Sequence, residues 1–192
     1  MMETRPTDAL LVVDVQNDFC PGGALAVNKG DAVVPVINRL LEHFDLHAFT
    51  RDWHPQDHCS FSAEPEFVDG SWPAHCIQST PGADFHPDLR VPAGALIQDK
   101  ATRQDQEAYS GFQATSLAEG LKARGVSRIF VCGLATDYCV KATALDGVRH
   151  GFEVVLVEDA CRAVDVPPGS SRLAVEEMRN AGVEVCTSGD VR

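Results

Sequence analysis

Cys139 is the residue whose surroundings most favour chemistry. It lies in Gly133-Leu-Ala-Thr-Asp-Tyr-Cys139, which joins an apolar run to a helical pattern. Because a helix N-terminus carries partial positive charge, a cysteine in the first turn can ionise well below its free pKa of about 8.5. Asp137 or Thr136 could cap this helix. We therefore weigh a nucleophilic thiolate against a small buried residue that packs on a sheet.

A nucleophilic cysteine needs a proton acceptor or a cation nearby. Asp14 ends the apolar run 9–14, and Lys100 ends another short run, whereas no histidine holds a comparable position. A buried, ionised carboxylate is costly unless it is paired, and Lys100 would be a suitable partner for Asp14. These two residues predict either acid–base partners of Cys139 or a plain Asp–Lys salt bridge.

A metal site is the second candidate. Asp52 and His54 are two residues apart, so their side chains point the same way in an extended segment, and His58 follows after a proline turn. A further histidine, His75, closes Ser71-Trp-Pro-Ala-His. A carboxylate with imidazoles suits Zn²⁺, Fe²⁺ or Mn²⁺. The alternative is a chance gathering of histidines in a polar loop.

The elements that must position these residues alternate along the chain. Apolar runs predict six strands, and helical patterns with Gly125 and Gly151 as stops predict the helices between them. The expected strands are 9–14, 46–50, 95–99, 128–133, 153–157 and 183–187, and the expected helices are 31–44, 115–124, 137–150 and 170–180.

This alternation predicts an α/β fold: three layers, α/β/α, around a mostly parallel six-stranded, Rossmann-like sheet. We expect residues 1–192 to form a single domain in which the irregular segment 53–95 has a binding role. Ligands bind beyond the carboxyl ends of the strands in such sheets. Polar and reactive residues are therefore expected to cluster there, because the ends of the runs carry Asp14, Arg51-Asp52, Asp99-Lys100 and the segment from Gly133 to Cys139.

Composition narrows the class of protein. The 192 residues include 16 Lys and Arg against 28 Asp and Glu, a formal net charge of −12. Such a chain is poorly suited to nucleic acid or to anionic membrane surfaces, and we expect a small-molecule partner. No apolar run approaches the roughly 18–20 residues of a membrane span, and no secretory signal is recognised. Seven cysteines without a Cys-x-x-Cys motif predict reduced thiols and a cytoplasmic protein.

The ordered motifs resemble the nicotinamidase (pyrazinamidase) family of the isochorismatase-like cysteine hydrolase superfamily. The Asp-x-His and Trp-Pro-x-His segments distinguish this family from isochorismatases, which resemble the rest but lack the metal. The pair Lys100-Ala101 departs from the Lys-Gly common in the family. The matching segments are 14–27, 50–58, 71–76, 99–100, 109–112 and 133–140.

The resemblance implies a catalytic triad of Asp14, Lys100 and Cys139. It implies an oxyanion hole formed by the backbone N–H groups of Ala135 and Cys139, with a cis peptide between Leu134 and Ala135. It also implies one divalent metal ion, with zinc first and iron or manganese as alternatives. The implied metal ligands are Asp52, His54 and His75, with His58 as a fourth ligand or a neighbour, and the implied substrate-binding residues are Phe19, Trp72, Tyr109 and Leu134.

The activity implied by the resemblance is hydrolysis of nicotinamide to nicotinate and ammonia through a thioester, in NAD salvage, with pyrazinamide as a further substrate and homo-oligomers as a possible assembly. Three alternatives stay open. One is a related amidase acting on a carbamoyl or ureido substrate. A second is a hydrolase whose metal activates water while Cys139 is structural. The third is a metal-binding protein without catalysis.

Overall fold

Six parallel strands form the central sheet of the computed structural model, which describes residues 1–192. Their order is β3-β2-β1-β4-β5-β6, so the expected α/β fold is confirmed and the sheet is parallel throughout. The strands are β1 (Asp8–Val13), β2 (Leu46–Asp52), β3 (Leu96–Lys100), β4 (Arg128–Leu134), β5 (Glu153–Arg162) and β6 (Glu184–Cys186).

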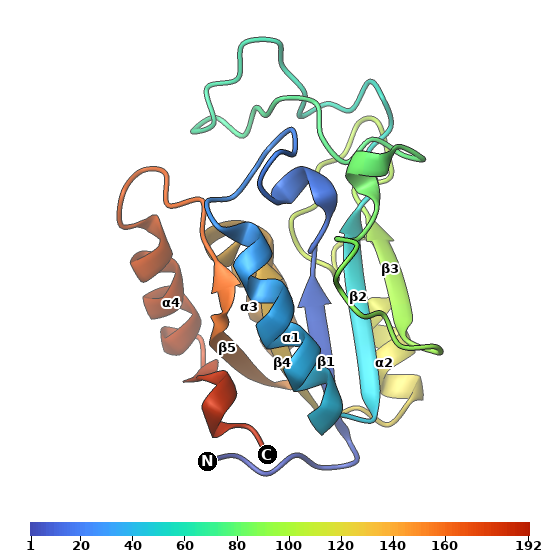
Figure 1. The fold of residues 1–192 in the computed structure, drawn as a ribbon, viewed down its shortest axis with the longest axis vertical. Helices are drawn as coiled ribbons and strands as arrows, with labels where there is room; N and C mark the ends of the chain where they lie inside the picture. Colours follow the sequence, from blue (N-terminus) through green and yellow to red (C-terminus); the bar gives the residue numbers. More distant parts are fainter.

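Helices lie on both faces of the sheet. In Figure 1, α1 lies on one face and α2 and α3 on the other, and α4 contacts α3. The central strands β1 and β4 are buried along their whole length, as expected for strands covered on both sides. The helices are α1 (Val34–Leu40), α2 (Leu117–Ala123), α3 (Lys141–Arg149) and α4 (Ser170–Asn180). None of them is long and apolar enough to cross a membrane.

The expected helix over 31–44 is interrupted. Pro35 lies at the first or second position of α1, where its missing N–H costs nothing. The α-helix therefore begins at Val34, and 3₁₀ turns flank it at Gly30–Val33 and Leu41–His43.

Two further elements differ from the sequence pattern. β5 runs to Arg162, beyond the predicted end at residue 157, because its register against β4 shifts and the polar pair 158–159 is accommodated within the strand. The expected helix 137–150 starts with a π-helical turn, Thr136–Val140, and continues as α3. This turn contains the candidate nucleophile Cys139 and is called the nucleophile turn below.

The connections place the site. From β1 the chain goes to β2 and β3 on one side, and it then returns to β4 on the other side, which makes the boundary of β1 and β4 a topological switch point. Gly133 permits close contact there, because a Cβ at this position would lie 2.1 Å from the Val13 carbonyl oxygen. Segment 53–95 is irregular apart from one 3₁₀ turn and isolated bridges, as predicted. Residues 53–83 of this segment lie beyond the carboxyl ends of the strands, and the rest returns past α1 to the start of β3 at the opposite end of the sheet (Figure 1).

Candidate active site

Four strand ends converge at the carboxyl edge of the sheet. Asp14 follows β1, Asp52 ends β2, Lys100 ends β3, and Cys139 lies in the nucleophile turn after β4. Because β2 and β3 are parallel neighbours, Asp52 and Lys100 are directly paired in register. All four side chains are buried. The structure thus brings together four of the strand-end residues that were expected to cluster at this edge.

Lys100 is the centre of this group. Its Nζ donates hydrogen bonds to Asp52 Oδ1 and to the carbonyl oxygen of Ala108, the latter at 3.1 Å. The same Nζ lies 3.0 Å from Asp14 Oδ2 and 3.4 Å from Cys139 Sγ. Burial lowers the pKa of Lys100. The nearby Asp14, Asp52 and Cys139 raise it by a larger amount, so the pKa lies well above its ordinary value. Lys100 is therefore a buried ammonium shared by two carboxylates and a thiol.

One carboxylate oxygen of Asp14 accepts a hydrogen bond and the other does not. Its Oδ1 accepts a hydrogen bond from Thr50 Oγ1 at 2.7 Å. Its Oδ2 is buried and accepts no hydrogen bond, although Lys100 Nζ is at ion-pair distance. Burial raises the pKa of Asp14, an effect that Lys100 opposes. A carboxylate with a raised pKa and a free oxygen is suited to accept a proton.

The surroundings of Cys139 decide its ionisation, which the sequence left open. A helix start can lower the pKa of a thiol, whereas burial raises the pKa of this thiol well above its ordinary value. Lys100 acts in the opposite direction, and the nearby Asp14 raises the pKa further. The desolvation and the carboxylates outweigh the ammonium. Cys139 in this site is therefore a thiol that needs a base, and carboxylate oxygens of Asp14 and Asp52 lie within 4.8 Å of its Sγ.

The nucleophile turn is held by a different interaction from the one predicted. No side chain caps it, neither that of Thr136 nor that of Asp137. The Asp137 carboxylate instead accepts hydrogen bonds from the backbone N–H groups of Val164 at 3.0 Å and Asp165 at 2.8 Å, and from Ser170 Oγ at 2.6 Å. Asp137 thereby connects the nucleophile turn to the segment between β5 and α4.

The backbone before the nucleophile turn has the expected cis peptide. The bond between Leu134 and Ala135 is cis, and Ala135 and Cys139 line the same cavity. The Ala135 N–H donates no hydrogen bond within the protein, so it is available to an incoming group. Leu134 was expected to contact substrate, but its side chain is buried in the core and does not line the cavity.

Asp52, His54 and His75 form a candidate metal-binding group, called the metal-binding group below. One donor atom from each lies within 4.8 Å of the others. The Nδ1 atoms of His54 and His75 face the carbonyl oxygens of Ala101 at 3.3 Å and Pro73 at 2.8 Å. A hydrogen bond from Nδ1–H to a carbonyl leaves the Nε2 lone pair for a metal ion.

The unsatisfied atoms of this group fit a divalent cation. His54 Nε2 is buried without a hydrogen-bond partner, 3.5 Å from Asp52 Oδ2. His75 Nε2 lies 3.9 Å from the same oxygen. Burial raises the pKa of Asp52, but Lys100 and the two histidines lower it more, so this carboxylate is ionised. Two imidazole nitrogens and one carboxylate are a donor set that zinc accepts.

His58 lies beside this group. Its Nδ1 is 2.8 Å from Ser60 Oγ, and its Nε2 is 3.2 Å from the carbonyl oxygen of Gln106. Its ring centroid is 4.2 Å from that of His54. Because both ring nitrogens of His58 already have partners, the geometry favours a neighbour of His54 over a fourth ligand.

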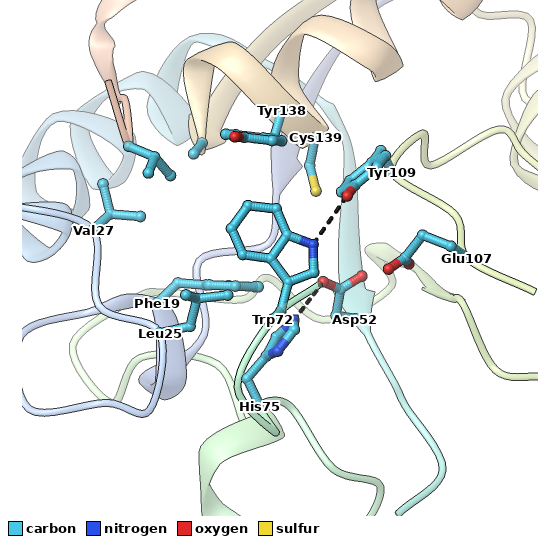
Figure 2. Close-up of a pocket in the computed structure, with 12 residues that line it drawn as sticks. Phe19, Leu25, Val27, Asp52, Trp72, His75, Glu107, Tyr109, Tyr138 and Cys139 are labelled. Carbon is cyan, nitrogen blue, oxygen red and sulfur yellow. Dashed lines mark hydrogen bonds and ion pairs between the residues drawn. The ribbon is translucent and has the colours of Figure 1, made fainter. Parts of the chain in front are cut away.

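A mostly apolar cavity opens onto the thiol and onto Asp52 and His75 of the metal-binding group (Figure 2). Three predicted substrate-binding residues line it, namely Phe19, Trp72 and Tyr109. Trp72 Nε1 donates a hydrogen bond to the Tyr109 hydroxyl at 3.0 Å. Burial raises the pKa of Tyr109 to about 12, so this hydroxyl stays protonated. These rings form a flat-walled site for a small ring compound.

The sequence analysis missed five lining residues. Tyr138 precedes the nucleophile, and Glu107 precedes Tyr109 by two residues, the spacing that puts side chains on one face of an extended segment. Leu25 and Val27 belong to the matching segment 14–27, in which only Asp14 and Phe19 had been given a role, whereas Val164 belongs to no motif. The complete missed set is Leu25, Val27, Glu107, Tyr138 and Val164.

Comparison with known proteins agrees with this geometry. Residues 8–190 match the isochorismatase domain family. The nicotinamidase/pyrazinamidase of Mycobacterium tuberculosis is 44% identical, and the alignment covers 94% of this chain and 99% of that protein.

Two solved structures are similar over nearly the whole chain. The pyrazinamidase of Pyrococcus horikoshii in complex with zinc is 47% identical, with a TM-score of 0.87, and the match covers 95% of this chain and 99% of that one. PnC1 from L. infantum in complex with nicotinate is 37% identical, with a TM-score of 0.88 and coverages of 97% and 96%. The chain therefore belongs to the isochorismatase family.

Proposed function

We propose that this chain is a nicotinamidase, a metal-dependent cysteine amidohydrolase that converts nicotinamide to nicotinate and ammonia through a thioester. One observation carries the proposal: Cys139 Sγ lies 3.4 Å from the buried Lys100 Nζ, beside Asp14, in the wall of a cavity that also exposes the metal-binding group. The alternative amidases and the non-catalytic reading are not favoured, because relatives with this activity align over nearly the full chain.

The lining of the cavity fits the proposed substrate. Phe19, Trp72 and Tyr109 provide aromatic walls against which a single aromatic ring can stack. The relatives act on or bind single-ring compounds, since one is named a pyrazinamidase and another was solved with nicotinate. We extend both to this chain, with pyrazinamide as the second substrate.

Asp52, His54 and His75 would hold the divalent ion, with His58 supporting His54. Zinc is the first candidate, because the similar pyrazinamidase was solved with zinc, and iron and manganese are the alternatives. When bound, such an ion supplies a Lewis-acid contact for a ring nitrogen, which orients the substrate without supplying the nucleophile.

The catalytic steps are assigned to individual residues of the site. Asp14 accepts the thiol proton of Cys139, and Sγ attacks the carboxamide carbon. The N–H groups of Ala135 and Cys139 stabilise the negative oxygen that forms, and the Lys100 ammonium stabilises the thiolate and the carboxylate. Asp14 returns the proton to the nitrogen, and ammonia leaves as the C–N bond breaks. A water molecule deprotonated by Asp14 then attacks the thioester, which releases nicotinate and the Cys139 thiol.

Cellular context is a further part of the proposal. We expect a cytoplasmic enzyme of pyridine-nucleotide salvage that forms homo-oligomers. All seven cysteines are free, which suits a reducing compartment.

An ammonia-release assay tests the function. The zinc-loaded protein should hydrolyse nicotinamide, and Cys139→Ala should abolish turnover while zinc content, measured by plasma mass spectrometry, is retained. Rapid acid quenching of the parent enzyme should trap a nicotinoyl adduct on the Cys139 peptide. Turnover that survives in Cys139→Ala would instead show that the thioester scheme is wrong and that a metal-activated water performs the reaction.

A further inference from the structure

Glu107 is the acidic residue in the cavity wall that the mechanism does not use. It lies between β3 and α2, and its side chain faces the same space as Asp52 and Tyr109 (Figure 2). One of its carboxylate oxygens lies within 4.8 Å of a ring nitrogen of His54 and of a ring nitrogen of His58. Glu107 therefore approaches the metal-binding group from the cavity side.

Nothing in the protein neutralises this carboxylate. Its one hydrogen bond comes from the backbone N–H of the adjacent Ala108, at 2.8 Å. No lysine or arginine forms an ion pair with it, unlike the nearby Asp105, which is paired with Arg103. Glu107 is half-buried, and a carboxylate beside two imidazoles is stabilised further when positive charge is present there.

The charges of the proposed site supply the reason. A divalent ion and the Lys100 ammonium bring three positive charges, whereas Asp14 and Asp52 bring two negative charges. One positive charge is left over in a buried, water-poor region, where an uncompensated charge is costly. Glu107 is the remaining acidic side chain that lines the cavity, and it makes this balance neutral.

We propose that Glu107 is a charge-balancing partner of the metal centre, raising its affinity for a divalent cation without being one of the three ligands. This inference rests on the proposed metal site. Glu107 is outside the Asp52, His54 and His75 group, and it approaches that group through His54, with which it shares a second cluster of donor atoms that also includes His58. Its charge therefore acts from the next shell, where carboxylates commonly contribute a factor of about 10–100 to metal affinity.

The test is zinc affinity measured by competition with a chromophoric chelator, a readout independent of turnover. Glu107→Gln keeps the size of the side chain and removes its charge, so zinc should bind about 10–100-fold more weakly than in the parent. Glu107→Asp keeps the charge and should recover most of the affinity. Asp105→Asn is the matched control, because it removes one negative charge from the same segment at an exposed position.

The outcomes separate this inference from the proposed function. Equal zinc affinities for Glu107→Gln and Asp105→Asn, in a parent that binds zinc and hydrolyses nicotinamide, would overturn the role of Glu107 and leave the function intact. A parent that binds no zinc would overturn both the proposed metal site and this inference. Weaker zinc binding in Glu107→Gln with recovery in Glu107→Asp would support the charge-balancing role.

Discussion

Each end of the sheet buries an ion pair, and the two pairs differ in whether all of their buried polar atoms have hydrogen-bond partners. At the amino end, Arg128 Nε and Nη2 donate to the two oxygens of Asp8, and Nη2 also donates to the carbonyl oxygen of Glu3 at 2.9 Å. At the carboxyl end, one ammonium, that of Lys100, is shared by Asp14, Asp52 and a thiol.

The unpaired atoms are what distinguish the ends. Asp14 Oδ2 and His54 Nε2 are the buried side-chain polar atoms without a hydrogen-bond partner, and both lie at the carboxyl end. Native proteins satisfy nearly all such atoms, so each exception needs an explanation. At the amino end the pair connects two strands and has no capacity left. At the carboxyl end the free atoms are available for a proton and an ion.

The largest effect should come from removing the shared ammonium. Lys100→Met leaves two buried carboxylates without their counter-ion, and we expect kcat to fall by about 10⁴-fold or more, as for other catalytic triads. Steady-state ammonia release measures this, with Lys122→Met on the surface helix α2 as the control for a lost lysine. Turnover within tenfold of the parent would show that Lys100 is a structural partner only.

The amino-end pair should affect stability and not chemistry. Arg128→Met strands the buried Asp8 carboxylate and should lower the free energy of unfolding by about 3–5 kcal/mol, while kcat/KM of the folded protein stays unchanged. Urea unfolding measures this effect. The exposed pair of Arg149 and Asp146 is the control, and Arg149→Met should cost less than about 1 kcal/mol. A large loss of kcat/KM in Arg128→Met would contradict the division between the two ends.

Substitutions of His54 and His58 should show which of these two histidines is a metal ligand. His54→Ala removes the nitrogen that has no partner within the protein, and zinc affinity should fall by more than about 100-fold, with a strong rise in KM. His58→Ala should cost less, because both of its nitrogens bond to other groups. Chelator competition and KM give the comparison. An equal loss of zinc affinity in both variants would show that His58 is also a metal ligand.

The smallest effect should come from the contact that positions the nucleophile turn. In the parent protein two backbone N–H groups and one hydroxyl donate to the Asp137 carboxylate. Asp137→Asn places an amide N–H₂ against these donors, and we expect kcat to fall by about 10-fold. Asp165→Asn is the matched control, since the Asp165 side chain accepts hydrogen bonds from the backbone of Gly169 and Ser171 and makes none to the nucleophile turn. The rate of Cys139 alkylation by iodoacetamide should fall only in Asp137→Asn.

Patterns in the chain predicted much of the fold. Apolar runs located all six strands, and α4 begins and ends where its pattern predicted, at 170 and 180. Such runs are reliable because strands buried on both faces consist mostly of apolar residues. The extension of β5 to Arg162 escaped prediction, because a register shift depends on the neighbouring strand β4 and leaves no local pattern.

The site was predicted unevenly for a related reason. Residues within motifs, such as Asp14, Lys100 and Cys139, could be named because parallel strands end at one edge. The contact between Lys100 and Asp52 was missed, because it joins two motifs that the sequence analysis gave to different functions. Glu107 and Val164 belong to no motif and were found only as walls of the cavity.

By itself the sequence determined which reactive groups exist and at which edge of the sheet they stand, because hydrophobic periodicity sets the strands and strand ends set the edge. Only the tertiary structure decided how those groups share charge. Whether Cys139 is a thiol or a thiolate, and whether His54 has a free nitrogen, depends on burial and on atoms a few ångströms away in other segments. Electrostatic interactions act through space, so the order of residues along a chain does not encode them directly.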